Sequence, residues 1–289
     1  MNAEKASPWS RLTSRVCCLL QYLLPQHVLS RLVARLAEAK TPWLKNLLIN
    51  HAIRYFDIDT DEVLCASASD YGSFNDFFTR ALKPGLRPVA TGENVIVSPA
   101  DGRISQRGNI TAGRFFQAKG HTYPLEKLLA DERLAARFQS GKFATVYLSP
   151  RDYHRVHMPV AGKLVEARYI PGKLFSVNPV TVAGVANLFA RNERLICNFE
   201  SERGPVCVIL VGALLVAGIE SVWHGHYAPG KPCHEYFATP IPYAKGAEIG
   251  RFKFGSTVIL LVPKNYTLEP GRGEGASVKM GESLARDRC

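Results

Sequence analysis

The sequence contains no long hydrophobic run. No stretch of its 289 residues approaches the ~20 consecutive apolar residues that a membrane-spanning helix needs. The first ten residues are polar, and no apolar segment with a cleavage site follows them, so we expect no signal peptide. The sequence therefore predicts a chain that does not span a membrane.

Several motifs that would define other classes of protein are also missing. The 7 cysteines are odd in number and lack the spacing of a disulfide framework, which predicts reduced thiols in a cytosolic compartment. There is no glycine-rich phosphate loop of the nucleotide-binding type. No group of cysteines and histidines has zinc-finger spacing.

Scattered histidines remain as candidate metal ligands. His154 and His157 are three residues apart, but they continue a strand-like run into Met158-Pro159, where the geometry of a helix is not expected. A second group combines histidines with a cysteine: His224, His226, Cys233 and His234. We interpret the histidines of this second group as surface or hydrogen-bonded residues and predict no metal site.

Basic residues are in excess. The formal net charge is +11, while the apolar fraction of 46% and the charged fraction of 21% are those of a protein with a sizeable core. A basic excess favours an anionic partner, either nucleic acid or an acidic lipid surface. The length suits one large domain or a domain with an appendage.

Residues 12–56 have the pattern of helices, which Pro25 and Pro42 divide into three. In the middle helix an apolar stripe of Leu29, Leu32, Val33 and Leu36 follows helical spacing, and basic residues outnumber acidic ones around it. Two interpretations stay open from this periodicity alone. The helices are either a cap packed on the main domain or interfacial helices that lie on anionic lipid.

The pattern changes after residue 95, where short apolar or alternating runs lie between glycine and proline breaks. These runs predict strands at residues 95–97, 143–148, 164–170, 195–199, 206–216 and 258–262, with one helix among them at 125–138. Helices followed by strands predict an α+β fold. We place a helical region at residues 1–65 and a β-rich domain at 66–289.

Three separate segments carry residues with chemical potential. Gly255-Ser256-Thr257 opens an apolar run, so it places a hydroxyl at a loop-to-strand junction beside a residue with a permissive backbone. Residues 149–159 supply His154 and His157, and residues 98–102 supply Asp101. Serine, histidine and aspartate form the triad of hydrolases, but Ser256 lacks the Gly-x-Ser-x-Gly elbow of the α/β-hydrolases. Taken singly, Asp101 is also a turn former and His157 a core histidine.

Three further segments accompany these in order along the chain: residues 117–121 (QAKGH), 171–178 (PGKLFSVN) and 187–194 (NLFARNER). From about Leu20 to about Leu268 the chain thereby resembles the bacterial, membrane-associated phosphatidylserine decarboxylases. Phe254 departs from the pattern, because the family usually has leucine before Gly-Ser-Thr. This change affects only the detailed shape of the cleavage site.

The resemblance implies a self-processing enzyme. His157, oriented by Asp101, would remove the Ser256 hydroxyl proton, and the chain would break between Gly255 and Ser256. Residue 256 would become a covalent pyruvoyl cofactor, which forms a Schiff base with the amine of the substrate. His154 would protonate the substrate after carbon dioxide leaves, and the product would be phosphatidylethanolamine.

The resemblance also implies partners and a location. We expect contact with an anionic phospholipid membrane and with phosphatidylserine, a heterodimer of the two cleavage fragments, and no nucleic acid. Further dimerisation of that heterodimer stays open. The expected location is peripheral, on the cytoplasmic face of the bacterial inner membrane. The rival interpretations are a soluble pyruvoyl decarboxylase of a free amino acid and a non-catalytic, basic membrane-binding module.

Overall fold

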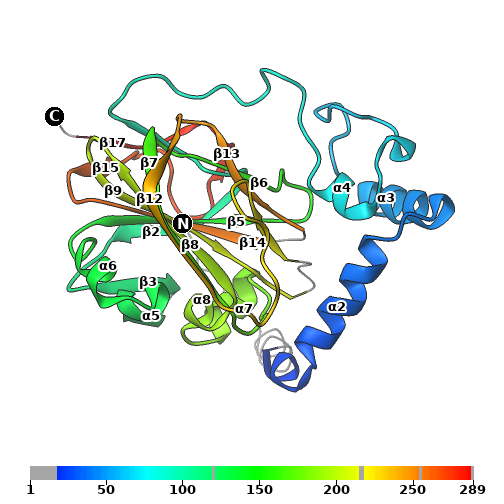
Figure 1. Ribbon diagram of the computed structural model, residues 1–289, viewed down its shortest axis with the longest axis horizontal. Helices are drawn as coiled ribbons and strands as arrows, with labels where there is room; N and C mark the ends of the chain where they lie inside the picture. The colour runs from blue at the N-terminus through cyan, green and yellow to red at the C-terminus, as the bar shows by residue number, and fades with distance from the viewer. Residues whose placement is uncertain (1–17, 119–120, 215–217, 254–255, 288–289) are drawn as a thin grey trace, which may run out of the picture.

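The computed structural model describes residues 18–118, 121–214, 218–253 and 256–287. Helices come first in the chain and a β-rich body follows, which confirms the predicted α+β class (Figure 1). The helices α2, α3 and α4 lie together at one side of that body.

The amino-terminal helices begin and end where the prolines predict. Residues 18–23 are helical before Pro25, α2 spans Gln26–Ala37, and α3 spans Pro42–Phe56. Pro42 suits the first turn of α3, because its fixed φ is helical and an N–H there would have no helical partner. A short 3-10 turn (Ala68–Asp70) and α4 (Phe74–Phe78) follow.

These helices share a small core. Ile49 of α3 is buried against Phe77 and Phe78 of α4. The Lys45 Nζ is also buried, and it donates to three backbone carbonyls of the segment between α3 and α4. Contacts thus cross the predicted boundary at residue 65, whose position stays a prediction.

The β-rich body contains many short strands and four short helices among its described residues. In chain order they are β1 (Val95–Val97), β2 (Gly102–Asn109), β3 (Arg114–Ala118), β4 (His121–Pro124), α5 (Leu125–Leu129), α6 (Glu132–Ala136), β5 (Lys142–Leu148), β6 (Arg155–His157), β7 (Gly162–Ile170), α7 (Pro179–Gly184), α8 (Leu188–Arg191), β8 (Arg194–Ser201), β9 (Gly204–Val211), β10 (Ile219–Ser221), β11 (Gly225–His226), β12 (Cys233–Tyr243), β13 (Glu248–Phe252), β14 (Ser256–Val262), β15 (Tyr266–Leu268), β16 (Ser277–Val278) and β17 (Ser283–Asp287).

An eight-stranded antiparallel sheet organises the body, with the order β12-β7-β8-β9-β14-β5-β2-β16. A four-stranded sheet, β11-β10-β13-β6, and a three-stranded sheet, β1-β17-β15, pack against one face of it and enclose the main core. The helices α5 to α8 cover the other face over a second core (Figure 1). β14 lies inside the large sheet and is buried along its whole length, because side chains from both of its faces enter a core.

Two predicted elements differ from the structure. The helix predicted at residues 125–138 is divided, since Ala130 has a left-handed backbone and the Asp131 side chain caps a second helix by accepting from the Leu134 N–H. The helices α7 and α8 were not predicted at all. The strand predicted at 206–216 ends at Val211, and its last two predicted residues, 215–216, lie outside the described residues.

Gly102, at the start of β2, fits a position that no other residue fits. Its φ is +149°, and a Cβ there would lie 2.2 Å from the carbonyl oxygen of Tyr147. We expect Gly102→Ala to lower the free energy of unfolding by roughly 2–4 kcal/mol, measured by urea denaturation.

Gly271→Ala is the matched control, because a Cβ at Gly271 meets no atom within 4 Å. It should change stability by less than about 0.5 kcal/mol. Equal effects of the two substitutions would show that the close approach at Gly102 is unimportant.

Candidate active site

Ser256 is the first residue of the buried central strand β14. Its Cα pairs with that of Leu148 in β5, and its side chain is fully buried. Among the described residues the Ser256 Oγ has no hydrogen-bond partner. A buried unpaired hydroxyl costs about 1–3 kcal/mol, so it calls for an explanation beyond stability. The predicted cleavage partner, Gly255, and the neighbouring Phe254 lie outside the described residues.

His154 is buried between β5 and β6, with its ring centroid 4.2 Å from that of Phe78. Its Nδ1 lies 2.8 Å from the carbonyl oxygen of Asp152. Because a carbonyl only accepts, Nδ1 carries the proton and Nε2 is bare. Nε2 is buried and has no partner within the described part of the chain.

Burial lowers the pKa of His154 to about 3, and the nearby positive charge of Arg80 acts in the same direction. The ring is therefore neutral at neutral pH. In this state His154 accepts a proton at Nε2, and the predicted role of proton donor requires it to take up a proton first. The Phe252 N–H donates to the His154 carbonyl oxygen at 3.0 Å, which ties the residue to the strand that leads toward Ser256.

His157 ends β6, and its ring is held at both nitrogens. Nδ1 lies 2.8 Å from the Gly246 carbonyl oxygen, and Nε2 lies 3.0 Å from the Tyr153 hydroxyl. Burial lowers the pKa of His157, so this ring is also biased toward its neutral form. Gly246 and Tyr153, which the sequence analysis did not identify, are thus the groups that orient this histidine.

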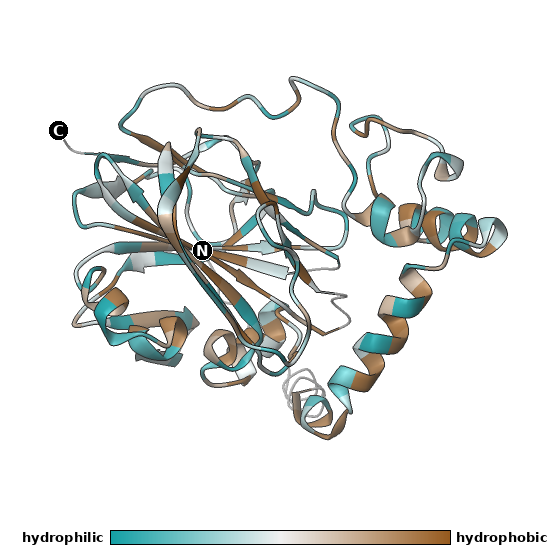
Figure 2. Cartoon of the chain, viewed as in Figure 1, coloured by the Kyte–Doolittle hydropathy of each residue, from teal (hydrophilic) through white to brown (hydrophobic). Residues whose placement is uncertain are grey.

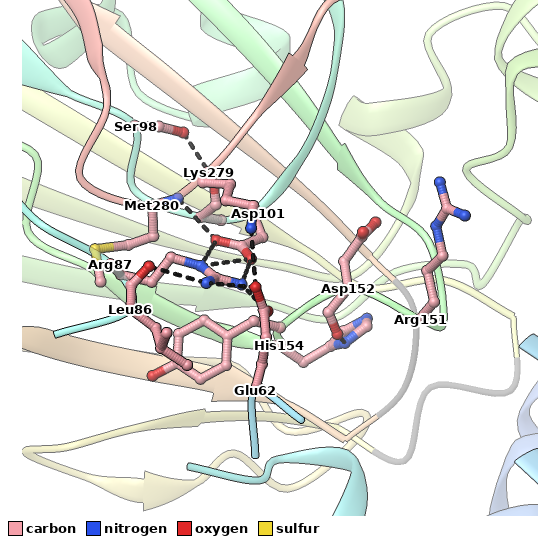
Figure 3. Close-up of polar contacts among 12 residues, drawn as sticks. Glu62, Leu86, Arg87, Ser98, Asp101, Arg151, Asp152, His154, Lys279 and Met280 are labelled. Carbon is pink, nitrogen blue, oxygen red and sulfur yellow. Dashed lines mark hydrogen bonds and ion pairs between the residues drawn. The ribbon is translucent and has the colours of Figure 1, made fainter. Parts of the chain in front are cut away.

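Asp101 lies between β1 and β2 and is bound on two sides (Figure 3). The Arg87 guanidinium donates to it through Nη2 at 2.7 Å and Nε at 2.9 Å, and the Met280 N–H donates at 2.7 Å. Arg87 also donates to Glu62, and this bond lowers the pKa of Glu62 to about 2. The buried guanidinium therefore neutralises two carboxylates at once.

Asp101 and His157 are neighbours without a hydrogen bond between them in the described structure. The His157 N–H donates to the carbonyl oxygen of Pro99 at 2.8 Å, which brings the two segments together. The charge of Asp101 raises the pKa of His157, against the larger effect of burial. The influence of Asp101 on the ring is electrostatic. Its predicted function in cleavage stays a prediction.

Asp101 opens onto a polar cavity of about 240 Å³. Arg80, Arg87, Asp152, Tyr153 and Lys279 contribute to its walls. Arg87 and Glu62 were missed in the sequence because they lie in a polar, turn-rich segment that carries no motif.

His224, His226 and His234 are exposed, as expected, and two of them make hydrogen bonds. His224 Nδ1 lies 3.0 Å from Glu235, and His234 Nε2 lies 2.7 Å from Glu166. His224, Cys233 and Glu235 also place one potential ligand atom each within 4.8 Å of one another, as a metal site would require. The predicted absence of a metal site therefore stays a prediction.

The fold is that of a β-rich protein with buried histidines and a buried serine at the start of its central strand. The family model described as phosphatidylserine decarboxylase matches residues 74–286, and a second, described as PSD, matches 17–57. A phosphatidylserine decarboxylase proenzyme of Pseudomonas paraeruginosa is 52% identical over 278 residues, which cover 93% of this chain and 96% of that protein.

The proenzymes of the same name from Pseudomonas putida and Stutzerimonas stutzeri are 49% and 50% identical. Each alignment covers 95% of this chain, and they cover 98% and 95% of the relatives. The chain belongs to the phosphatidylserine decarboxylase family.

The two histidines should have separable functions. We expect His157→Ala and Asp101→Ala to block self-cleavage. His154→Ala should still cleave at least in part, while decarboxylation by the cleaved protein falls by about 10²-fold or more. A denaturing gel measures cleavage, and release of carbon dioxide measures decarboxylation.

His234→Ala is the control, because this histidine bonds to Glu166 outside the site. It should cleave and decarboxylate normally. If His154→Ala abolished cleavage while His157→Ala cleaved normally, the two roles would have to be exchanged.

Proposed function

We propose that this chain is a self-processing decarboxylase that makes a pyruvoyl group from Ser256. It then converts phosphatidylserine to phosphatidylethanolamine and carbon dioxide. The observation that carries the proposal is the buried, unpaired Ser256 hydroxyl at the start of β14, where the family resemblance puts the cleavage. The names of the relatives support phosphatidylserine as the substrate and an uncleaved precursor as the first form of the chain.

Self-cleavage needs a nucleophile, a proton acceptor and a leaving oxygen. The Ser256 hydroxyl supplies the first and the last, and a neutral imidazole supplies the second. The oxygen adds to the Gly255 carbonyl and the amide becomes an ester. Elimination breaks the bond between Cβ and this oxygen, so residue 255 keeps both oxygens as a carboxylate. Water then releases the nitrogen of residue 256 as ammonia.

The chain itself would hold the resulting group, because residue 256 is the first residue of β14. Neighbouring strands bind β14 on both edges, and its apolar surroundings exclude water from the reaction. A pyruvoyl group supplies a carbonyl that withdraws electrons from the carbon next to the substrate amine.

The two fragments would stay together after cleavage. Residues 256–287 contribute β14, β15, β16 and β17. Of these, β14 pairs with β5 and β9 of the larger fragment, β16 with β2 and β17 with β1, while β15 pairs with β17. The Met280 N–H binds Asp101 across the two fragments, and Lys279 binds Glu62. These contacts support the proposed heterodimer of cleavage products.

Ser256→Ala should give a single uncleaved chain without decarboxylase activity, because alanine has neither the nucleophile nor the leaving oxygen. Thr257→Val is the matched control, since Thr257 is the next residue and has a buried, unpaired hydroxyl in the same described strand. It should cleave normally. Intact-mass analysis shows whether each variant is cleaved. A Ser256→Ala protein that is cleaved and active would contradict the pyruvoyl proposal.

We also propose that the amino-terminal helices attach the protein peripherally to an anionic membrane, on the cytoplasmic face of the bacterial inner membrane. In α2 the residues that face the protein are Gln26, Ser30 and Ala37. The apolar residues Leu32 and Leu36 are 56% and 46% exposed. α2 thus turns polar and small side chains toward the body and leucines toward solvent. A helix that caps a domain does the opposite and buries its leucines against the domain.

Polar contacts hold this region to the body and leave its apolar side outward. The Leu174 N–H donates to the side chain of Gln26, and the Ser176 N–H donates to that of Gln21. Figure 2 shows the hydrophobic stripe along α2. Other large apolar side chains exposed nearby are Leu19, Leu20, Leu23, Val28, Trp43, Leu47 and Tyr55. Within the described ranges, no helix is long and apolar enough to cross a bilayer.

The exposed stripe favours a lipid substrate over a free amino acid. We expect Leu32→Glu/Leu36→Glu to reduce flotation with anionic vesicles by about 10-fold or more, because each buried leucine contributes about 1.5–3 kcal/mol. Wild-type binding should weaken only in part at 1 M salt, where the Debye length falls to about 3 Å.

Val222→Glu/Tyr236→Glu is the matched control, because it changes two exposed apolar residues of the body, 46% and 73% accessible. This control should float like wild type. Equal flotation of all three proteins would move the membrane contact away from α2.

A further inference from the structure

Glu193 and Ser256 lie in one row across the large sheet. β9 lies between β8 and β14, and the two registers continue to place Gly212 between Glu193 and Ser256. The Gly212 N–H donates to the Glu193 carbonyl oxygen at 2.9 Å, which supports this alignment. Directly opposed residues of antiparallel strands point to the same face. The side chains of Glu193 and Ser256 thus share a face, with only a glycine between them.

The cores confirm which face this is. Glu193 directly precedes β8, and Leu195 lies two residues beyond it; Val258 lies two residues beyond Ser256 in β14. Both Leu195 and Val258 belong to the main core. Because side chains alternate along a strand, Glu193 and Ser256 point toward the same core. Glu193 is 2% exposed, so its carboxyl group is enclosed there.

The carboxyl group of Glu193 occupies the space that a side chain at position 212 would fill. Its Cγ and Oε1 each lie 2.7 Å from the position of a Cβ on Gly212. Since opposed Cβ atoms lie about 4.5–5.5 Å apart, Oε1 is within about 8 Å of the Ser256 Cβ. A substrate carbon attached near residue 256 would enter this interval. Gly212 therefore gives the carboxyl group access to the reactive residue.

The oxygen of Glu193 that faces Gly212 is the one that carries the proton in the neutral acid. Burial raises the pKa of Glu193, and this favours the neutral acid. The Tyr169 hydroxyl donates to Oε2 at 2.9 Å, so the acid proton resides on Oε1. His154, in contrast, is neutral with a bare Nε2. In its neutral form Glu193 thus offers a proton at Oε1, whereas neutral His154 offers only an acceptor at Nε2.

We propose that Glu193, in place of His154, donates the proton that replaces the carboxyl group of the substrate, an inference that rests on the proposed function. Departure of carbon dioxide leaves its bonding electron pair on the substrate carbon. That pair forms the new C–H bond with the Oε1 proton, and the O–H electrons remain on Glu193 as a carboxylate. Water returns a proton to Glu193 before the next turnover. The net reaction consumes one proton for each carbon dioxide released.

Glu193→Gln is the decisive variant, because glutamine keeps the shape and neutrality of the acid but holds no acidic proton. The probe is short-chain phosphatidylserine in detergent micelles. Three quantities are measured: self-cleavage by gel, release of carbon dioxide, and the mass gained by the small fragment when borohydride fixes the substrate amine onto residue 256. We expect normal cleavage, normal mass gain, and carbon dioxide release at least about 10²-fold slower than wild type. Glu193→Asp should recover part of the rate.

Glu166→Gln is the matched control, because Glu166 is also buried in the large sheet but binds His234 and Arg168. It should release carbon dioxide within about threefold of wild type, a smaller change than loss of an acid produces. Similar rates for Glu193→Gln and wild type would overturn the proposal. So would loss of borohydride fixation, which would assign Glu193 to binding. If the Glu193→Gln chain failed to cleave while the Glu193→Asp chain cleaved, Glu193 would be assigned to self-cleavage. That result would also overturn the proposal. An uncleaved wild type would instead refute the proposed function.

Discussion

The structure depends on the position of β14 inside the large sheet. This strand is bound by β5 on one edge and β9 on the other, and every one of its residues is buried. The proposed chemistry breaks the chain immediately before the first residue of this strand. A strand at the edge of a sheet would lose much of its anchorage after such a break, whereas β14 keeps hydrogen bonds on both sides. The fold can therefore place a new chain end in a dry core without losing that end.

Burial of the site also sets the protonation of the groups around it. His154 and His157 each bind a backbone carbonyl through Nδ1, and burial lowers both of their pKa values. The same desolvation raises the pKa of Glu193. The interior thus favours the unprotonated form of the two histidines and the protonated form of Glu193. A site that both removes and donates protons needs groups in these two states. Asp101 stays apart from this group, since Arg87 and Met280 already bind it.

The sequence predicts elements whose local signal agrees with their surroundings. The apolar run at 258–262 is a strand in the structure, and Pro42 begins a helix. The predicted helix at 125–138 failed because Ala130 adopts a left-handed conformation that its sequence does not reveal. The site residues Asp101, His154, His157 and Ser256 were chosen through motifs, and their roles remain predictions. Arg87 lies in no motif, and Glu193 lies in the motif at 187–194 without being chosen, because the importance of both arises from contacts between segments far apart in the chain.

The most direct test of the account is the intact mass of the purified wild-type protein. The account predicts two fragments, residues 1–255 and 256–289, that copurify under native conditions. The small fragment should be lighter, by the elements of ammonia, than a peptide that begins with an unmodified serine. A single chain of full length, or a small fragment that keeps its amino-terminal serine, would contradict the claim that Ser256 becomes the reactive group.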